Sequence, residues 1–305
     1  MTKPKLIIIG GPTGVGKTEI AIDMARRFGG EIISADSMQV YRYMDIGTAK
    51  PTEEERHLVP HHVIDVVNPD EEYNAAAFLY DAARAIEDLE RRNKKSFVVG
   101  GTGLYIRILL GGLFEGPGAD LQLRCLLKEK MEHFGKRYLY DELKRIDTRA
   151  ARKIHPDDTV RIIRALEVYE QTGESIVSHQ EKHRFSDNAY EYLKIGLMAD
   201  RKTLYDKIDR RCERMIVEGL CDEVKNLLKR GYDGTLKPMK TICYKHMISH
   251  VNREIELEQA LQRIARDTRH YAKRQLTWFR NDEEIKWFHP DSRDDVAAAI
   301  EHFIA

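Results

Sequence analysis

The sequence predicts an α/β protein, in which a parallel β-sheet is covered by helices and an all-helical segment is inserted into the chain. Three observations predict this fold. Short apolar runs alternate with helical patterns over residues 5–110, a phosphate-binding motif follows the first apolar run, and residues 121–173 show helical patterns without a strand. Alternation at this spacing favours parallel strands, because each helix returns the chain to the starting end of the sheet.

The phosphate-binding motif GPTGVGKT lies between the apolar run Leu6–Ile9 and the helical pattern Glu19–Phe28. This is G-x-x-x-x-G-K-[ST] in the context that the motif requires, so we predict a P-loop NTPase-like core. The glycines let backbone N–H groups point at an anion, and the helix N-terminus adds positive charge. The lysine would neutralise phosphate oxygens and the threonine would hold Mg²⁺. A di- or triphosphate is therefore expected at Gly11, Pro12, Thr13, Gly14, Val15, Gly16, Lys17 and Thr18.

The predicted elements follow the motif in order. Strands are expected at Lys5–Gly10, Glu31–Ser34, His62–Val67, Ser96–Gly100, Tyr192–Met198 and Ile285–Phe288. Helices are expected at Thr18–Phe28, Ala75–Arg92, Thr102–Leu110, Leu121–Phe134, Thr159–Thr172, Lys202–Glu218, Cys221–Arg230, Leu257–Phe279 and from Arg293 onward. Ligands of parallel sheets bind beyond the carboxyl ends of the strands, so the segments that follow these strands are expected to form the site.

Length and composition predict the domain organisation and the cellular setting. The chain has 305 residues, 42% of them hydrophobic, which suits two domains or one domain with a large insertion. We expect a catalytic core at residues 1–115 and 190–305 and a helical insertion at 116–189. No apolar stretch reaches ~18 residues, so no membrane span is expected. The chain start leaves no room for a signal peptide, and four scattered cysteines show no metal spacing, so we expect a cytoplasmic protein. We also expect it to be a monomer.

Basic residues are concentrated in the C-terminal third of a chain whose net charge is zero. Residues 1–110 carry 14 Lys and Arg against 16 Asp and Glu, whereas residues 201–280 carry 19 against 11. In the helix Leu257–Phe279, spacings of three and four place most of the cations on one face. A basic stripe that ends in Gln, Trp and Arg is typical of RNA contacts, although a solvated helix face has the same pattern. The stripe comprises Arg263, Arg266, Arg269, Lys273 and Arg274, and we expect Trp278 and Phe279 in the core.

Two segments beside the phosphate motif carry groups suited to chemistry. Asp36 follows the second predicted strand, where it could be a general base, a Mg²⁺ ligand through water, or a helix N-cap. The segment Asp36–Pro51 is rich in large polar residues, which favours substrate contact. Gly100–Gly103 offers glycines and the Thr102 hydroxyl, which suit a phosphate oxygen or a base edge. Asp65 is the best candidate for a further acidic Mg²⁺ ligand, and His62 is expected to be packed or hydrogen-bonded.

Taken together, several segments resemble the tRNA dimethylallyltransferase family over essentially the whole chain. The segments are GPTGVGKT, ADSMQVYRYMDIGTAKP at 35–51, HHVIDV at 61–66, GGTGLY at 100–105, KIHPDDTVRIIRALEVYEQTG at 153–173 and RQLTWFR at 274–280. The resemblance implies transfer of a dimethylallyl group from its diphosphate to the N6 amine of the adenosine directly 3′ of the anticodon. The implied partners are tRNA and dimethylallyl diphosphate, with Mg²⁺ as cofactor.

The resemblance also implies roles for individual residues. Asp36 matches the general base, and Thr102 the hydroxyl near the diphosphate bridge and the acceptor. Arg211 matches the arginine that clamps the leaving group, and the insertion matches the module that grips the anticodon stem-loop. The implied tRNA contacts are Asp36, Ser37, Met38, Gln39, Arg124, Arg274 and Gln275.

The sequence departs from the family in two places. Ile242–His246 stands where the family commonly has Gly-Tyr-(Arg/Lys)-(Gln/Glu), and Asp157 stands where Asn is usual. Three alternatives stay open: an ATP-dependent small-molecule or nucleoside kinase, an isopentenyltransferase acting on free adenine nucleotides, and a non-catalytic nucleotide-gated RNA-binding protein. The helical insertion argues against a small acceptor, and Asp36 with Thr102 argues against a non-catalytic protein.

Overall fold

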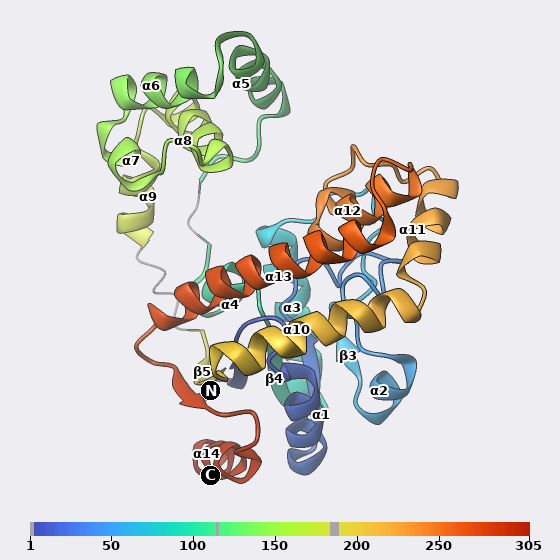
Figure 1. Ribbon diagram of the computed structural model, residues 1–305. Coiled ribbons are helices and arrows are strands. Elements are labelled where there is room, and N and C mark those ends of the chain that lie inside the picture. The colour runs from blue at the N-terminus through green and yellow to red at the C-terminus, as the bar shows by residue number, and fades with distance from the viewer. Residues whose placement is uncertain (1–2, 114–115, 184–188) are drawn as a thin grey trace. The chain divides into compact units, whose positions relative to one another are not determined.

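A computed structural model describes residues 3–113, 116–183 and 189–305 of the chain (Figure 1). It divides into two compact units. The first combines Met1–Leu110 with Asn188–Ala305, and the second is Gly111–Asp187. Each unit is described by itself below.

The first unit is built on a six-stranded parallel sheet with the strand order β3-β2-β4-β1-β5-β6. Gly10 of β1 aligns with Gly100 of β4 and with Gly196 of β5, so these strands end at the same edge. The apolar run Leu6–Ile9 is buried along its whole length, as expected for a parallel strand covered on both faces. The strands are β1 Lys5–Gly10, β2 Gly30–Ser34, β3 His61–His62, β4 Lys95–Gly100, β5 Glu191–Leu197 and β6 Lys286–Phe288.

Helices cover the sheet and extend beyond it, and α13 packs against α10 and α12 (Figure 1). The helix that follows the phosphate loop begins after Gly16, and no side chain of the described residues caps its first turn. Its N–H groups therefore stay open toward the loop. The helices are α1 Lys17–Phe28, α2 Glu53–Leu58, α3 Ala75–Arg91, α4 Gly103–Gly111, α10 Arg201–Val217, α11 Leu220–Lys229, the 3₁₀ turn η1 Pro238–Lys240, α12 Ile242–Val251, α13 Leu257–Arg280 and α14 Arg293–Ile304.

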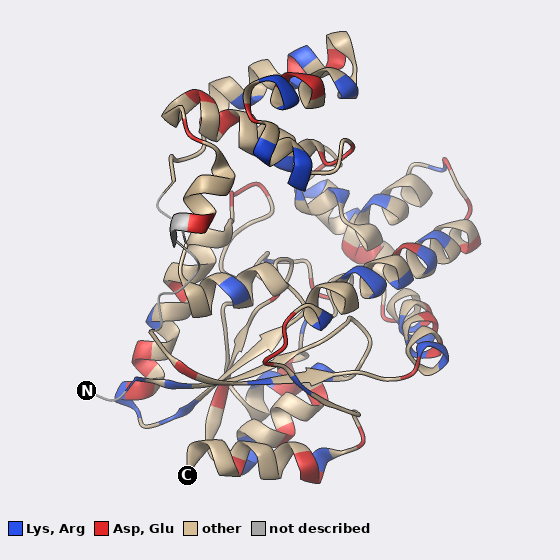
Figure 2. Ribbon diagram, turned by 90° about the vertical axis from the view of Figure 1, so that its left-hand side faces the viewer, with Lys and Arg blue, Asp and Glu red and all other residues tan. Residues whose placement is uncertain are grey.

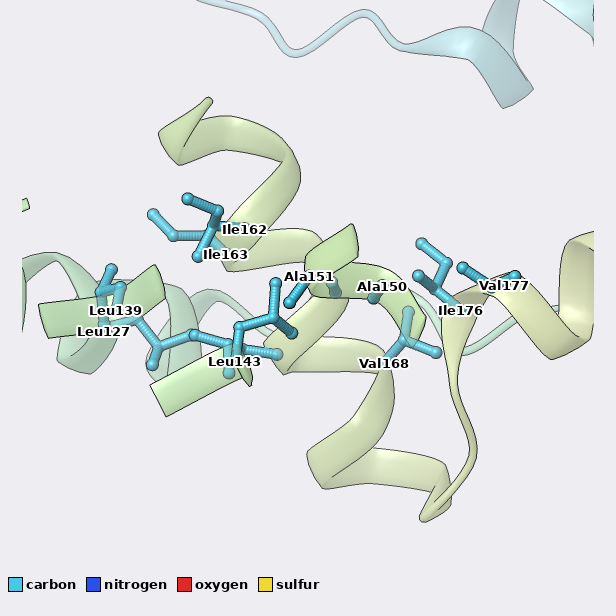
Figure 3. Close-up of a cluster of buried hydrophobic side chains, with 12 residues drawn as sticks. Leu127, Leu139, Leu143, Ala150, Ala151, Ile162, Ile163, Val168, Ile176 and Val177 are labelled. Carbon is cyan, nitrogen blue, oxygen red and sulfur yellow. The ribbon is translucent and has the colours of Figure 1, made fainter. Parts of the chain in front are cut away.

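The second unit is a helical bundle with a hydrophobic core of its own (Figure 3). Its helices are α5 Leu121–Phe134, α6 Lys136–Ile146, α7 Thr148–Lys153, α8 Thr159–Thr172 and α9 Ile176–His183. The buried cluster comprises Leu127, Leu139, Leu143, Ala150, Ala151, Ile162, Ile163, Ala165, Leu166, Val168, Ile176 and Val177. In neither unit do the described residues form a helix long and apolar enough to cross a bilayer.

The α/β fold class is confirmed, but the third strand is much shorter than predicted. The sequence predicted a strand over His62–Val67, whereas β3 contains His61 and His62 alone. Val63 and Asp65 adopt left-handed backbone conformations with φ of 61° and 56°, which end the strand. The sequence prediction also missed α2, α9 and α12.

A buried carboxylate holds the β2–β3 side of the sheet to the end of α3. Glu31 is 5% exposed and accepts two hydrogen bonds from the Arg92 guanidinium, at 2.5 and 2.9 Å, while His62 Nε2 lies 2.7 Å from Oε2. The hydrogen bonds from Arg92 are the largest cause that lowers the pKa of Glu31, from 4.5 to about 2. His62 was expected to be packed or hydrogen-bonded, and its hydrogen bond to Glu31 confirms the second of these roles.

We predict that Glu31→Gln reduces the dependence of the free energy of unfolding on pH in the acid range. A lowered folded-state pKa stabilises the fold above the unfolded-state pKa, and this stabilisation is lost as pH falls from about 4.5 to about 2. Glu31→Gln should also cost about 1–3 kcal/mol at pH 7, since charge-assisted hydrogen bonds are lost. Urea unfolding at a series of pH values measures both effects, with Glu87→Gln, at an exposed position of α3, as control. If the free energy of unfolding of Glu31→Gln fell with acid as steeply as that of the wild type, this account would be contradicted.

Candidate active site

The segments that follow β1, β2 and β4 meet at the carboxyl edge of the sheet. Thr102 N–H donates to Ala35 O at 3.1 Å, and the Thr102 hydroxyl accepts from Ser37 N–H at 3.0 Å. The segment that contains Asp36 and the segment Gly100–Gly103, which the sequence singled out separately, are thus directly hydrogen-bonded to each other. The parallel direction of the strands brings them together despite their separation in sequence.

Lys17 lies inside its own phosphate loop. Its Nζ donates to Gly11 O at 3.0 Å and to Pro12 O at 2.8 Å. Burial lowers its pKa from 10.5 to about 8, the charge of Asp36 opposes that shift, and the charge of Arg211 adds to it. An ammonium, a carboxylate and a guanidinium therefore line the same cavity, where an anion would be attracted to the two cations.

Asp36 uses one of its two carboxylate oxygens within the described part of the chain. Oδ1 accepts from Met38 N–H at 2.8 Å, and no donor of the described residues reaches Oδ2. Turns rather than a helix follow this residue, so the N-cap alternative is wrong. A carboxylate oriented by one backbone N–H, with its second oxygen uncommitted, is suited to accept a proton or to bind a metal through water.

Gln275 of α13 links two of the segments. Its side-chain oxygen accepts from Thr13 N–H at 2.8 Å, and its side-chain nitrogen donates to Gly101 O at 3.0 Å. A Cβ at Gly101 would lie 2.2 Å from that nitrogen, so only glycine allows this approach. Gln275 is 6% exposed, and it therefore lies at the phosphate loop rather than on an open surface, where an RNA contact was expected.

Lys17, Asp36 and Gln275 line one cavity of about 750 Å³, whereas Thr102 is not among its lining residues. Of the predicted site residues, the lining includes Thr13, Gly14, Gly16, Lys17, Thr18, Asp36, Gln39, Arg211 and Gln275. The sequence analysis gave no role to Tyr271, which also lines the cavity one helical turn before Gln275. Burial, and then the charge of Asp36, raise the pKa of Tyr271 to about 12. Its position on the face of α13 that carries Gln275 is the signal that could have found it.

Asp65 does not serve as the acidic Mg²⁺ ligand predicted from sequence. Its two oxygens lie 2.7 Å from Lys50 Nζ and 2.7 Å from Arg56, and the Lys50 side chain is fully buried. A carboxylate that already neutralises two cations has little left to offer a metal. The described residues contain no cluster of three or more His, Cys, Asp and Glu that could hold a metal ion.

Comparison with known proteins agrees with this arrangement. Residues 39–282 match the family model described as IPP transferase, and residues 4–62 match one described as isopentenyl transferase. The chain belongs to the IPP transferase family.

Its relatives cover nearly the whole chain. It is 52% identical over 302 residues to tRNA dimethylallyltransferase 2 of Syntrophus aciditrophicus, with 99% of this chain and 97% of that protein covered. Among solved structures, the tRNA isopentenylpyrophosphate transferase of Bacillus halodurans is 40% identical, with a TM-score of 0.72 over 99% of this chain and 98% of that one. A eukaryotic dimethylallyltransferase acting on tRNA is 28% identical, with a TM-score of 0.81 over 99% and 79%. The resemblance found from sequence is confirmed.

The basic stripe of this IPP transferase lies on the outer face of α13. Lysines and arginines are mixed with acidic residues over most helices (Figure 2). The positions of the basic residues on α13 therefore say more about RNA contact than their number does. Arg269 pairs with Asp209 at 2.5 Å. Phe279 is 4% exposed, as predicted, but Trp278 is 37% exposed, and its predicted core position is wrong. The residues of α13 that remain exposed include Arg263, Arg266, Lys273, Arg274 and Arg280.

Arg124 of the helical unit is held by a carboxylate that is fully buried. It donates to both oxygens of Glu167 at 2.7 and 2.8 Å, and Arg164 donates to the same carboxylate at 2.5 Å. Burial opposes ionisation of Glu167, but these hydrogen bonds keep its pKa below the ordinary value. Glu167 thus orients both arginines, and Arg124 remains about one-third exposed.

We predict that Gln275→Ala weakens the phosphate site. The substitution leaves Thr13 N–H and Gly101 O without their partner, at about 1–3 kcal/mol for each buried group left unsatisfied. Both the urea midpoint and the affinity for inorganic diphosphate, measured by calorimetry, should fall. Gln262→Ala, on an exposed position of the same helix, is the control. Unchanged diphosphate affinity in Gln275→Ala would show that the link between the two segments does not shape the loop.

Proposed function

We propose that this chain transfers a dimethylallyl group from dimethylallyl diphosphate to N6 of the adenosine immediately 3′ of the anticodon in tRNA, with release of diphosphate. The family and the names of the relatives support this activity. The observation that carries it is the single cavity into which the phosphate loop, Asp36 and Arg211 all open. A carboxylate beside a diphosphate site suits alkylation of an amine, because the amine loses a proton as the new bond forms.

The proposed reaction uses these side chains as follows. The N6 lone pair attacks C1 of the donor, the C1–O bond breaks, and diphosphate leaves with the bonding electrons. The proton from N6 passes to Asp36 Oδ2, the oxygen that no donor among the described residues reaches. Lys17, Arg211 and the loop N–H groups neutralise the charge that develops on the diphosphate. The Thr102 hydroxyl accepts from Ser37 N–H, so its own proton is free to bond the leaving oxygen or the acceptor.

Mg²⁺ is the metal that these residues fit. It prefers oxygen ligands, keeps several waters, and is commonly held by few protein groups together with substrate phosphates. The Thr18 hydroxyl at the start of α1 would hold it, with Asp36 reached through water. When bound, Mg²⁺ would supply further neutralisation of the diphosphate.

We propose residues 116–189 as the module that grips the anticodon stem-loop, with residues 1–115 and 190–305 as the catalytic core. The proposed RNA contacts are Asp36, Ser37, Met38, Gln39, Arg124 and Arg274, whereas the buried Gln275 acts on the phosphate loop. We also propose that the protein acts as a monomer. The free cysteines of the described chain suit a cytoplasmic location.

A kinase is the alternative that the site supports less well. Its candidate acidic partner, Asp65, is paired with Lys50 and Arg56. Incubation with labelled ATP and with labelled dimethylallyl diphosphate separates the two activities directly, because only one of them moves phosphorus.

We predict that Asp36→Ala binds both substrates yet loses turnover by roughly 10²–10⁴-fold, the contribution typical of a general base. The assay combines dimethylallyl diphosphate, Mg²⁺ and an anticodon stem-loop, followed by mass analysis of the RNA. Wild-type protein should add one dimethylallyl group to the target adenosine. Asp23→Ala, at an exposed position of α1, is the control. Wild-type rates in Asp36→Ala would exclude the general-base role.

We predict that Arg263→Glu and Lys273→Glu raise the KM for the stem-loop and reduce its dependence on salt, because each removes one phosphate contact from the stripe. The affinity for inorganic diphosphate should not change, since neither residue lines the cavity. The control is Lys94→Glu, which makes the same change of charge at an exposed position. Lys94 precedes β4, and the site lies at the other end of that strand. If both stripe variants keep the wild-type salt dependence, the stripe is only a solvated face.

A further inference from the structure

Glu223 of α11 carries a carboxylate with an unusual set of partners. Its Oε2 accepts from the backbone N–H of Asp45 at 2.9 Å and of Ile46 at 2.7 Å. Its Oε1 accepts from Gly47 N–H at 3.1 Å and from the Tyr244 hydroxyl at 2.8 Å. Three consecutive N–H groups that converge on one carboxylate form an anion-binding nest, and bonds to a charged acceptor are stronger than neutral ones.

Tyr244 supports this contact from the other side. It is 1% exposed, and burial raises the pKa of its hydroxyl well above the ordinary value, so the hydroxyl keeps its proton and donates. A Cβ at Gly47 would lie 2.6 Å from the Tyr244 ring, so the ring packs directly on the backbone of the segment. Tyr244 lies in Ile242–His246 and matches the tyrosine of the family pattern, from which this segment departs at Cys243 and His246.

The segment Asp45–Lys50, whose first residues bind Glu223, is anchored a second time through Lys50. Lys50 Nζ lies 2.5 Å from Asp45, 2.7 Å from Asp65 and 2.9 Å from Tyr41 O. The backbone of Asp45–Lys50 is therefore held from α11 and from inside the protein. This segment lines the cavity, and so do Arg211, Arg214, Met215 and Glu218 from α10 and its C-terminal end, which directly precede α11. Glu223 thus ties one wall of the cavity to the other.

The anchored segment also positions a residue near the chemistry. Gln39 Nε2 donates to Ala49 O at 3.2 Å, and Gln39 Oε1 accepts from the Ser34 hydroxyl at 2.8 Å. The Gln39 side chain is therefore oriented by the segment that Glu223 holds. Gln39 lies three residues after Asp36 in the segment proposed to contact the acceptor.

We propose that Glu223 is a positioning residue: it holds Asp45–Gly47 against α11, which follows the cavity wall of α10, and through Ala49 it orients Gln39 toward the acceptor nucleotide. The proposal rests on the proposed function for the identity of that acceptor. Glu223 touches no reacting atom and acts entirely through the segment. The phosphate loop takes no part in these contacts, so binding of diphosphate by the loop should not depend on them.

The test is Glu223→Gln, which keeps the shape of the side chain but offers one acceptor oxygen in place of two. Amide hydrogen exchange should become faster in residues 45–50. The Kd and KM for the anticodon stem-loop should rise by about tenfold or more, as expected when a charge-assisted hydrogen bond is lost. The Kd for inorganic diphosphate should stay at the wild-type value. Asp222→Asn removes the neighbouring, exposed carboxylate of α11 and is the matched control.

Tyr244→Phe removes one of the four donors and leaves the ring in place, so it should give a smaller change of the same kind. It also decides the matter if Glu223→Gln does not fold. Wild-type exchange and RNA affinity in the folded variants would overturn the proposal. A parallel loss of diphosphate affinity and thermal stability would overturn it as well, because it would indicate a merely structural role. Exchange and RNA affinity need no turnover, so a failure of the proposed activity is seen separately, in wild-type protein.

Discussion

The site depends on the fact that every strand of the sheet runs in the same direction. The chain leaves β1, β2 and β4 at one edge, so three segments distant in sequence meet there. The Gln275 amide then fixes two of them to each other, through Thr13 N–H and Gly101 O. The third is fixed by the hydrogen bond between Ser37 N–H and the Thr102 hydroxyl. Few contacts are needed, because the sheet already places the segments within reach of one another.

The same geometry places positive charges where they favour binding of an anion. Burial disfavours the charged form of Lys17, and Arg211 adds a second positive charge beside it. A bound diphosphate would relieve both effects, since an opposite charge favours ionisation. Asp36 already opposes the shift, with one oxygen oriented by Met38 N–H. A phosphate loop combined with a nearby carboxylate thus suits a diphosphate that departs while a proton is removed from the acceptor.

Short sequence patterns predicted those parts of the site that are formed by neighbouring residues in the chain. The phosphate loop and its helix follow from eight consecutive residues, and Asp36 and Thr102 follow from their positions after strands. Left-handed conformations at Val63 and Asp65, which shortened β3, have no such signature outside glycine. The pairing of Asp65 with Lys50 and the hold of Glu223 on Asp45–Gly47 join residues far apart in sequence. Such contacts are set by tertiary packing, which composition and spacing do not encode.

The central claim is that the phosphate loop holds a leaving group while carbon moves to RNA. The most direct test uses dimethylallyl diphosphate with a carbon label in the allyl group and a phosphorus label in the diphosphate. After reaction with an anticodon stem-loop, we predict the carbon label in the RNA and an equal amount of phosphorus label in free diphosphate. Phosphorus label in the RNA, or release of diphosphate with no carbon label in the RNA, would contradict the account.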